Sequence, residues 1–372
     1  MARMACISDL HMGDNKSALN NPAVVAKVAQ DIANGTNGAI DTLVLNGDIW
    51  EQCIPAGTLE ENPGDGFCSS VAAASRGFFS ALLAKVKIGK MVWVPGNHDL
   101  SLWKRLSDAS KLPFRTAPTG VTLARDSSPA AQKFFDVLFK STGPLPAFSI
   151  AYPILLVAGA YPDDFPYILF THGHVMDPLV QGRESDAIYL ALRALGCRRP
   201  ELPNDPAQTL TITQIAEATD GFTLALWKQD STVDYTYWNL ISRRLAHPQC
   251  CPLAGKPTTP VDPTDHPSSP RDGQMAQASW FLETAITDPN LPTPVGSLRS
   301  PTVDTAFNKP SCFVFGHDHL GTTVQAGICG VPFNIFDSGG WTVEFDGHTP
   351  HSHILVWNDE STTPTDIFLA LK

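Results

Sequence analysis

Short runs of apolar residues that end at a polar side chain recur along the chain. The first two cover residues 4–8 and 42–46, and a third covers 91–94. Such runs lack the apolar–polar alternation of a half-exposed strand and are typical of strands buried on both faces. We therefore expect neighbouring buried strands in the N-terminal part of the chain.

Helical patterns separate these strands. Residues 23–33 carry valine and alanine at helix-compatible spacing, with Pro22 in front, where a first turn tolerates proline, and Gly35 behind. Residues 69–86 form a second helical pattern. This alternation favours β-α-β units with parallel strands. Further strands are expected at 147–158, 167–171, 312–315, 322–325, 331–336, 341–345, 354–357 and 367–371.

The pattern changes after His174. Helical patterns occupy 179–195, 206–218 and 222–245, and residues 252–273 are rich in Pro, Thr, Ser and Asp. We interpret the chain as a single domain, 1–372, with a mainly helical, Pro-rich insertion at 176–308. The insertion leaves and re-enters the core beside two polar clusters, so we expect it to lie over them as a cap. The alternative is a peripheral subdomain that contacts no substrate.

Composition and charge exclude several classes. Of 372 residues, 43% are hydrophobic and 17% charged, which is enough apolar material for a large core. The net charge of −11 argues against a broad nucleic-acid interface. No run is long enough to span a bilayer, and Asp9 follows the start too closely for a signal peptide. We expect a cytoplasmic protein with reduced cysteines; its oligomeric state is left open.

Five short polar clusters stand at the ends of predicted strands, where α/β sheets usually keep their active sites. Mixed carboxylate, amide and imidazole ligands suit Mn, Fe, Zn, Co or Ni rather than Ca or Mg alone. A single carboxylate such as Asp48 can use both oxygens and bridge two ions. The clusters are Asp9-Leu10-His11, Gly47-Asp48, Gly96-Asn97-His98-Asp99, Thr171-His172-Gly173-His174 and Gly316-His317-Asp318-His319.

These clusters resemble the signature of the calcineurin-like metallophosphoesterases, which is DxH, GD, GNH(D/E), a later His, and GHxH. Every element is present, and the resemblance covers residues 4–319 apart from the insertion. It implies a four-layer α-β-β-α sandwich with two metal ions. The first ion would be held by Asp9, His11, Asp48 and His319, and the second by Asp48, Asn97, His172 and His317.

The resemblance also implies the chemistry. Two ions about 3.5–4 Å apart would clamp a phosphoryl group and generate a bridging hydroxide that attacks phosphorus. His98 would stabilise the transition state or give a proton to the leaving oxygen, and Asp99 would orient His98 or another imidazole. His172 would be the ligand in Thr-His-Gly-His, with His174 near the substrate or bonded to backbone.

Three further features are less decisive. Asp14 and Glu51 each stand just beyond a predicted ligand, so they could contact the ligands or cap a loop. The segment 337–341 resembles a turn that follows GHxH in several relatives, with Asp337 in place of Asn.

The motif surroundings suggest a substrate class. Residues 47–51 and 96–103 are similar to the branch that includes lipid A precursor pyrophosphohydrolases, although that branch has Gly-Asn-Arg-Asp where this chain has Gly-Asn-His-Asp. We expect hydrolysis of a phosphodiester or pyrophosphate bond in a phosphorylated small molecule or a lipid or nucleotide conjugate, with Mn as the leading metal. The alternatives are a phosphomonoesterase or protein phosphatase, an Mre-type nuclease, and a non-catalytic scaffold. The complete ligand set opposes the scaffold, and the acidic charge opposes the nuclease.

Overall fold

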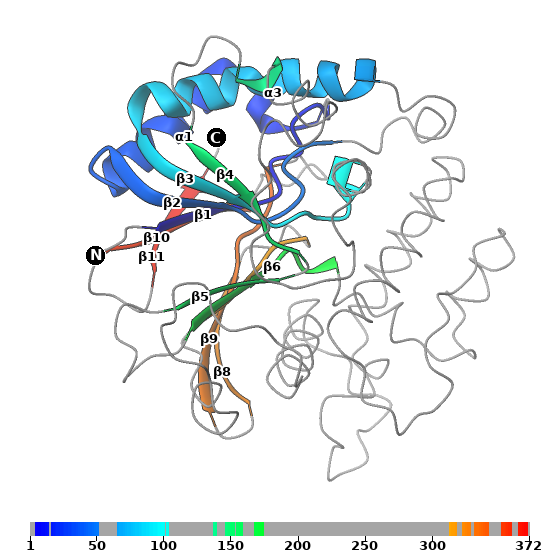
Figure 1. Ribbon diagram of the computed structural model, residues 1–372. Helices are drawn as coiled ribbons and strands as arrows, with labels where there is room; N and C mark the ends of the chain where they lie inside the picture. The colour runs from blue at the N-terminus through cyan, green and yellow to red at the C-terminus, as the bar shows by residue number, and fades with distance from the viewer. Residues whose placement is uncertain are drawn as a thin grey trace, which may run out of the picture.

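Two sheets lie face to face, and two long helices cover the outer side of the first sheet (Figure 1). The computed structural model describes residues 4–14, 16–51, 65–100, 102–103, 137–139, 146–152, 154–158, 167–174, 312–317, 322–328, 331–341, 351–358 and 364–370. Among these residues, no helix is both long and apolar enough to cross a membrane.

The first sheet has six strands in the order β11-β10-β1-β2-β3-β4. Its parallel part is built from β1 (Met4–Ile7), β2 (Ala39–Leu45), β3 (Lys87–Trp93) and β4 (Ala147–Ile150). The register pairs Cys6 with Val44 and Val44 with Val92. Two antiparallel strands, β10 (His351–Trp357) and β11 (Thr365–Ala370), complete the other side.

Helices α1 (Pro22–Gly35) and α3 (Asp65–Lys85) pack against each other over this sheet. The start of α1 follows from its sequence, because the Asn21 side chain accepts the Ala23 N–H at 2.9 Å and Pro22 occupies the first turn. Val28, Ala29 and Ile32 form its buried face. A short 3-10 turn, η1 (Ala18–Asn20), precedes α1.

The second sheet has five strands in the order β5-β6-β7-β9-β8. The central strands β6 (Tyr167–Thr171), β7 (Cys312–Phe315) and β9 (Val331–Asp337) are parallel, whereas β5 (Ile154–Ala158) and β8 (Thr322–Ile328) pair antiparallel at the edges. One apolar core fills the space between the sheets. It includes Cys6, Val44, Val92 and Leu355 from the first sheet, and Phe170, Val314 and Phe336 from the second.

The structure confirms an α/β protein with two mixed sheets and the predicted β-α-β order. The region 147–158, where strand structure was expected, contains two strands, and β4 belongs to the first sheet while β5 belongs to the second. The intervening sequence contains Pro153, which cannot donate to a sheet ladder. Trp341 lies in a bend rather than at the start of a strand. The expected insertion at 176–308 lies outside the described residues.

Candidate metal centre

The polar clusters follow the carboxyl ends of parallel strands from both sheets. In the first sheet, Asp9 comes after β1, Asp48 after β2 and Asn97 after β3. In the second sheet, His172 directly follows β6, and His317 follows β7 after Gly316. Backbone hydrogen bonds join the loops that carry them. Asp9 N donates to the Gly47 carbonyl at 2.9 Å, and Gly316 N donates to the His172 carbonyl at 2.8 Å. The candidate ligands therefore meet at one end of the sandwich.

The backbone at these positions is unusual. Asp9, His11, Asp48 and His317 have left-handed φ values of 52°, 43°, 50° and 86°. The remaining non-glycine residue with positive φ in the described part of the chain is Asn37, which lies in a turn. A left-handed non-glycine residue costs about 1–3 kcal/mol, and such residues cluster at functional sites. The surrounding fold therefore holds these four candidate ligands in conformations that the chain alone disfavours.

Close packing requires glycine at motif positions, and Gly96 and Gly316 are examples. A Cβ at Gly96 would lie 2.5 Å from Asp48 N and 2.7 Å from His172 Cδ2. A Cβ at Gly316 would overlap the Asp9 carboxylate and lie 2.8 Å from Ser8 Oγ. Any side chain at either position would therefore push a candidate ligand out of place.

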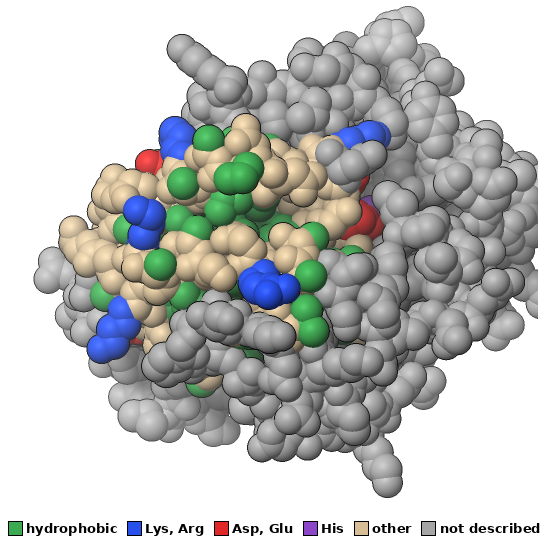
Figure 2. Space-filling model, turned by 90° about the horizontal axis from the view of Figure 1, so that it is seen from above, with side chains coloured by type: hydrophobic (Ala, Val, Ile, Leu, Met, Phe, Trp, Pro, Cys, Tyr) green, Lys and Arg blue, Asp and Glu red, His purple; other side chains and the backbone are tan. Residues whose placement is uncertain are grey.

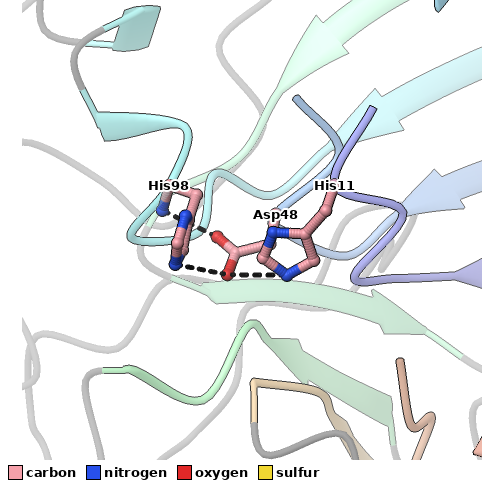
Figure 3. Close-up of side chains that lie close together, drawn as sticks. All are labelled: His11, Asp48 and His98. Carbon is pink, nitrogen blue, oxygen red and sulfur yellow. Dashed lines mark hydrogen bonds and ion pairs between the residues drawn. The ribbon is translucent and has the colours of Figure 1, made fainter. Parts of the chain in front are cut away.

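Asp48 lies at the centre of two groups of possible ligand atoms. The His11 group consists of His11, Asp48 and His98, and the His172 group consists of Asp48, His172 and His317. Within each group the ligand atoms lie within 4.8 Å of one another. Asp48 Oδ2 is 3.7 Å from His11 Nε2, 3.9 Å from His98 Nε2 (Figure 3) and 3.1 Å from His172 Nε2. One carboxylate thus faces imidazoles of both groups.

The charge state of Asp48 follows from these neighbours. Burial by itself would raise its pKa, but the imidazoles of His172, His98 and His11 outweigh burial and hold the pKa well below its usual range. Asp48 Oδ1 also accepts the backbone N–H of His98 at 2.8 Å. The site therefore keeps a buried, ionised carboxylate at its centre, which is the charge that a metal ligand needs.

His172 is fixed on both sides of its ring. It is fully buried, its Nδ1 lies 3.2 Å from the Asn46 carbonyl, and its Nε2 lies 3.0 Å from Asn97 Oδ1. The Asn46 side chain in turn donates to the Thr171 carbonyl at 2.9 Å. Burial lowers the pKa of His172, but Asp48 and Asp9 outweigh burial, so the net shift is upward. Asn46 had no predicted role, although its position as a polar residue ending a buried strand was a signal.

Glu51 is the carboxylate that lies against the His98 ring. His98 Nδ1 lies 2.9 Å from Glu51 Oε1 and 2.8 Å from Oε2, and His11 Nδ1 lies 3.1 Å from Oε2. Burial would raise the pKa of Glu51, but the two imidazoles lower it to about 2. An ionised carboxylate can only accept, so both imidazoles donate through Nδ1.

Asp99 instead ties two loops together. Its carboxylate accepts the backbone N–H of Trp50 at 2.9 Å and of Gly96 at 3.1 Å, as well as the Trp93 indole N–H at 3.1 Å. Burial and the nearby charge of Asp48 raise the pKa of Asp99 to about 7 against the effect of these donors. Asp99 therefore acts on the loop geometry rather than on His98.

The remaining predicted residues take several positions. Asp9 is fully buried, and its Oδ1 accepts the His317 backbone N–H at 2.9 Å. His174 is buried with its ring centroid 5.4 Å from that of His172. The Asp14 side chain accepts the Lys16 N–H at 3.0 Å, which is the loop-capping alternative. His319 lies outside the described residues.

The donor set fits metal ions. Each group combines the Asp48 carboxylate with two imidazoles whose ligand atoms lie within 4.8 Å of one another, and this ligand chemistry suits first-row transition metals. Acidic and histidine side chains come to the surface together at the border of the described part of the molecule (Figure 2). Fold and site together define a two-sheet α/β protein with a candidate metal centre where strands of both sheets end.

A comparison with known protein families agrees with this description of the fold and the site. The model for calcineurin-like phosphoesterases matches residues 2–241, so the chain belongs to this family of hydrolases acting on phosphoric ester bonds. Members of the family typically bind two metal ions. A search of curated proteins finds no match.

Proposed function

We propose that the chain hydrolyses a phosphodiester or pyrophosphate bond with two transition-metal ions. Asp9, His11, Asp48 and His319 would hold one ion, and Asp48, Asn97, His172 and His317 the other. The observation that carries this proposal is the position of Asp48 Oδ2, which faces His11 Nε2 at 3.7 Å and His172 Nε2 at 3.1 Å. A carboxylate shared in this way is what two adjacent ions require.

The chain's own groups have distinct tasks in this reaction. When bound, the ions would supply Lewis-acid activation of the phosphoryl group and of water. Asp48 and Asn97 face the same imidazole, His172, and together with it they would hold one ion. His98 directs Nδ1 to Glu51 and Nε2 toward Asp48, so Nε2 is the nitrogen that would give a proton to the leaving oxygen.

Charge supports a phosphodiester over a phosphomonoester. Within the part of the chain whose burial is described, no Lys or Arg is buried, so this part adds no cation to the interior of the site. A phosphomonoester carries a charge of about −1.5 to −2 at neutral pH, more than one phosphodiester group does. The similarity of 47–51 and 96–103 to the lipid A precursor pyrophosphohydrolase branch supports the pyrophosphate bond as the other candidate.

A substrate panel tests the proposal. The full chain, stripped of metal and reloaded in turn with Mn²⁺, Co²⁺, Ni²⁺, Zn²⁺ or Fe²⁺, is assayed with bis(p-nitrophenyl) phosphate, p-nitrophenyl phosphate and a nucleoside diphosphate conjugate. We expect the diester or the conjugate to be turned over with the highest kcat/KM, and Mn²⁺ to support the highest rate. Preference for the monoester would overturn the substrate assignment. Failure to bind any ion would overturn the mechanism.

A further inference from the structure

A row of buried aromatic rings leads from the first sheet to the His172 group. Tyr152 follows β4 and is 7% exposed, and His174 follows β6 and is 2% exposed. The Tyr152 hydroxyl lies 3.4 Å from His174 Nε2, and the two rings stack with centroids 6.3 Å apart. The Trp103 ring packs against the Tyr152 ring, with a distance of 5.7 Å between the two ring centroids. Neither Tyr152 nor Trp103 belongs to the pattern of metal ligands.

The imidazole of His174 lies against both histidines of the His172 group. Its ring centroid is 5.4 Å from that of His172 and 6.4 Å from that of His317, while those two rings are 5.2 Å apart. Three imidazoles from two strand ends therefore form one cluster, and in a close-packed interior each ring limits the movement of the others. A shift of His174 would move two candidate ligand nitrogens.

We propose that Tyr152 and His174 are positioning residues of the His172 group. The phenol fixes the imidazole of His174, and that imidazole holds the rings of His172 and His317 in the orientation that binds one ion. The inference rests on the proposed function, because it takes these two histidines as ligands. Groups that orient metal ligands change metal affinity by about 10- to 100-fold when they are removed.

The test uses the full chain, stripped of metal and titrated with Mn²⁺ in a calorimeter and with Co²⁺ in a spectrophotometer. Tyr152→Phe removes the hydroxyl and keeps the ring. We expect two binding events in the wild type. In the variant, one event should weaken by about 10- to 100-fold with a changed Co²⁺ absorption spectrum, and the other should stay within about twofold.

Thr36→Val is the matched control. The Thr36 hydroxyl is also buried and bonds the Ile32 carbonyl at 2.6 Å. Thr36 precedes β2, however, whereas Asp48 follows the opposite end of that strand. We expect its two metal affinities to match the wild type, and an equal loss in both variants would overturn the inference.

A double-mutant cycle separates positioning from general packing. His174→Phe keeps a ring but removes the nitrogen that contacts Tyr152. The hydroxyl acts through this nitrogen, so Tyr152→Phe should change affinity by less than about twofold in the His174→Phe background. Thermal unfolding of each metal-free variant reports whether it is folded.

The outcomes distinguish the two proposals. Wild-type binding of two ions with unchanged binding in Tyr152→Phe would overturn this inference alone, and so would an equal loss at both ions. A wild-type chain that binds no ion would overturn the proposed function, and this inference with it.

Discussion

Glu51 links the imidazoles of His98 and His11. Both its oxygens lie within 2.9 Å of His98 Nδ1, and Oε2 lies 3.1 Å from His11 Nδ1. Glu51→Gln would remove the negative charge and turn an NH₂ group toward one of these N–H donors. A well-placed proton donor contributes about 10²–10⁴-fold to rate, so we predict a fall in kcat of about tenfold or more. Steady-state kinetics on a diester checks this.

The control for Glu51 is Asp31→Asn, which breaks a surface ion pair with Lys27 on α1. We expect it to leave kcat unchanged, because exposed pairs contribute little. A Glu51→Gln enzyme with normal kcat but weaker metal binding would show that Glu51 serves His11 rather than His98.

A second prediction at the residue scale concerns the His98→Ala variant. Its side chain is 14% exposed, more than that of Asp48 at 2% or His172 at 0%, as a group that meets the substrate should be. His98→Ala should keep both metal ions but lose turnover most severely for esters with poor leaving groups, because these depend most on proton donation. The measurement is the dependence of kcat on leaving-group pKa in both enzymes. Equal losses across the series would contradict the proton-donor role.

Sequence reasoning located the candidate ligands but not the contacts that hold them. That the described candidate ligands meet at one end of the sandwich could be predicted, because each follows an apolar strand in a fixed pattern. The partner of His98 could not, because Glu51 and Asp99 are both carboxylates close to the motifs. Only the packed loops turn Asp99 toward the Trp50 and Gly96 amides and leave Glu51 for the imidazoles.

At the scale of elements, Asp99 joins the loop after β2 to the loop after β3. Asp99→Ala would leave the amides of Trp50 and Gly96 and the Trp93 indole buried without this acceptor. An unsatisfied buried donor costs about 1–3 kcal/mol, so we predict a loss of at least 2 kcal/mol in the metal-free protein at about pH 5.5. Urea unfolding measures it, with the exposed Asp41→Asn on β2 as control.

The loss of stability caused by Asp99→Ala should depend on pH. The pKa of Asp99 in the folded chain is raised from 3.8 to about 7, so the native state binds the proton more tightly than the unfolded state. The contribution of Asp99 to the stability of the metal-free wild type is therefore lost as the pH rises from about 4 through 7, and Asp99→Ala lacks this contribution. The difference between the two proteins should narrow toward pH 8. A difference that widens would contradict the assigned ionisation.

Most elements could be predicted because their signals are local. Asn21 and Pro22 mark the start of α1, and unbroken apolar runs mark β1 and β2. The division of 147–158 between two sheets could not be predicted, because both halves are apolar and only the tertiary pairing separates them. Ile150 lies beside Trp93 in the first sheet, whereas Ile154 lies beside Thr171 in the second.

At the scale of the whole molecule, the segment after β9 joins the two sheets beneath the site. Ser338 Oγ donates to the Phe315 carbonyl at 2.8 Å and lies 2.5 Å from Ser8 Oγ. Trp341 N donates to the Asp9 carbonyl at 3.1 Å. The Asp337 carboxylate accepts the Gly339 N–H at 3.0 Å, so Asp337 shapes this turn. The loops of β1 and β7 are thus held together by contacts that need no metal.

Metal binding should strengthen the connection between the two sheets. Asp48 follows a strand of the first sheet, and His172 and His317 follow strands of the second, so an ion held by all three stabilises the packing of one sheet on the other. An ion at 100 times its Kd adds about 2.7 kcal/mol to the free energy of unfolding. We therefore predict that Mn²⁺ raises the Tm of the metal-stripped chain by several degrees. Asp48→Ala should bind neither ion and abolish the rise, because both groups share its carboxylate.

Asp14→Ala is the matched control for this measurement, since the Asp14 side chain caps a turn through the Lys16 N–H. Its Tm should rise with Mn²⁺ as much as that of the wild type. If Asp48→Ala kept half of the rise and bound one ion, the two groups would be independent sites. That result would remove the shared carboxylate on which the two-ion mechanism depends, while a site for a single ion would remain.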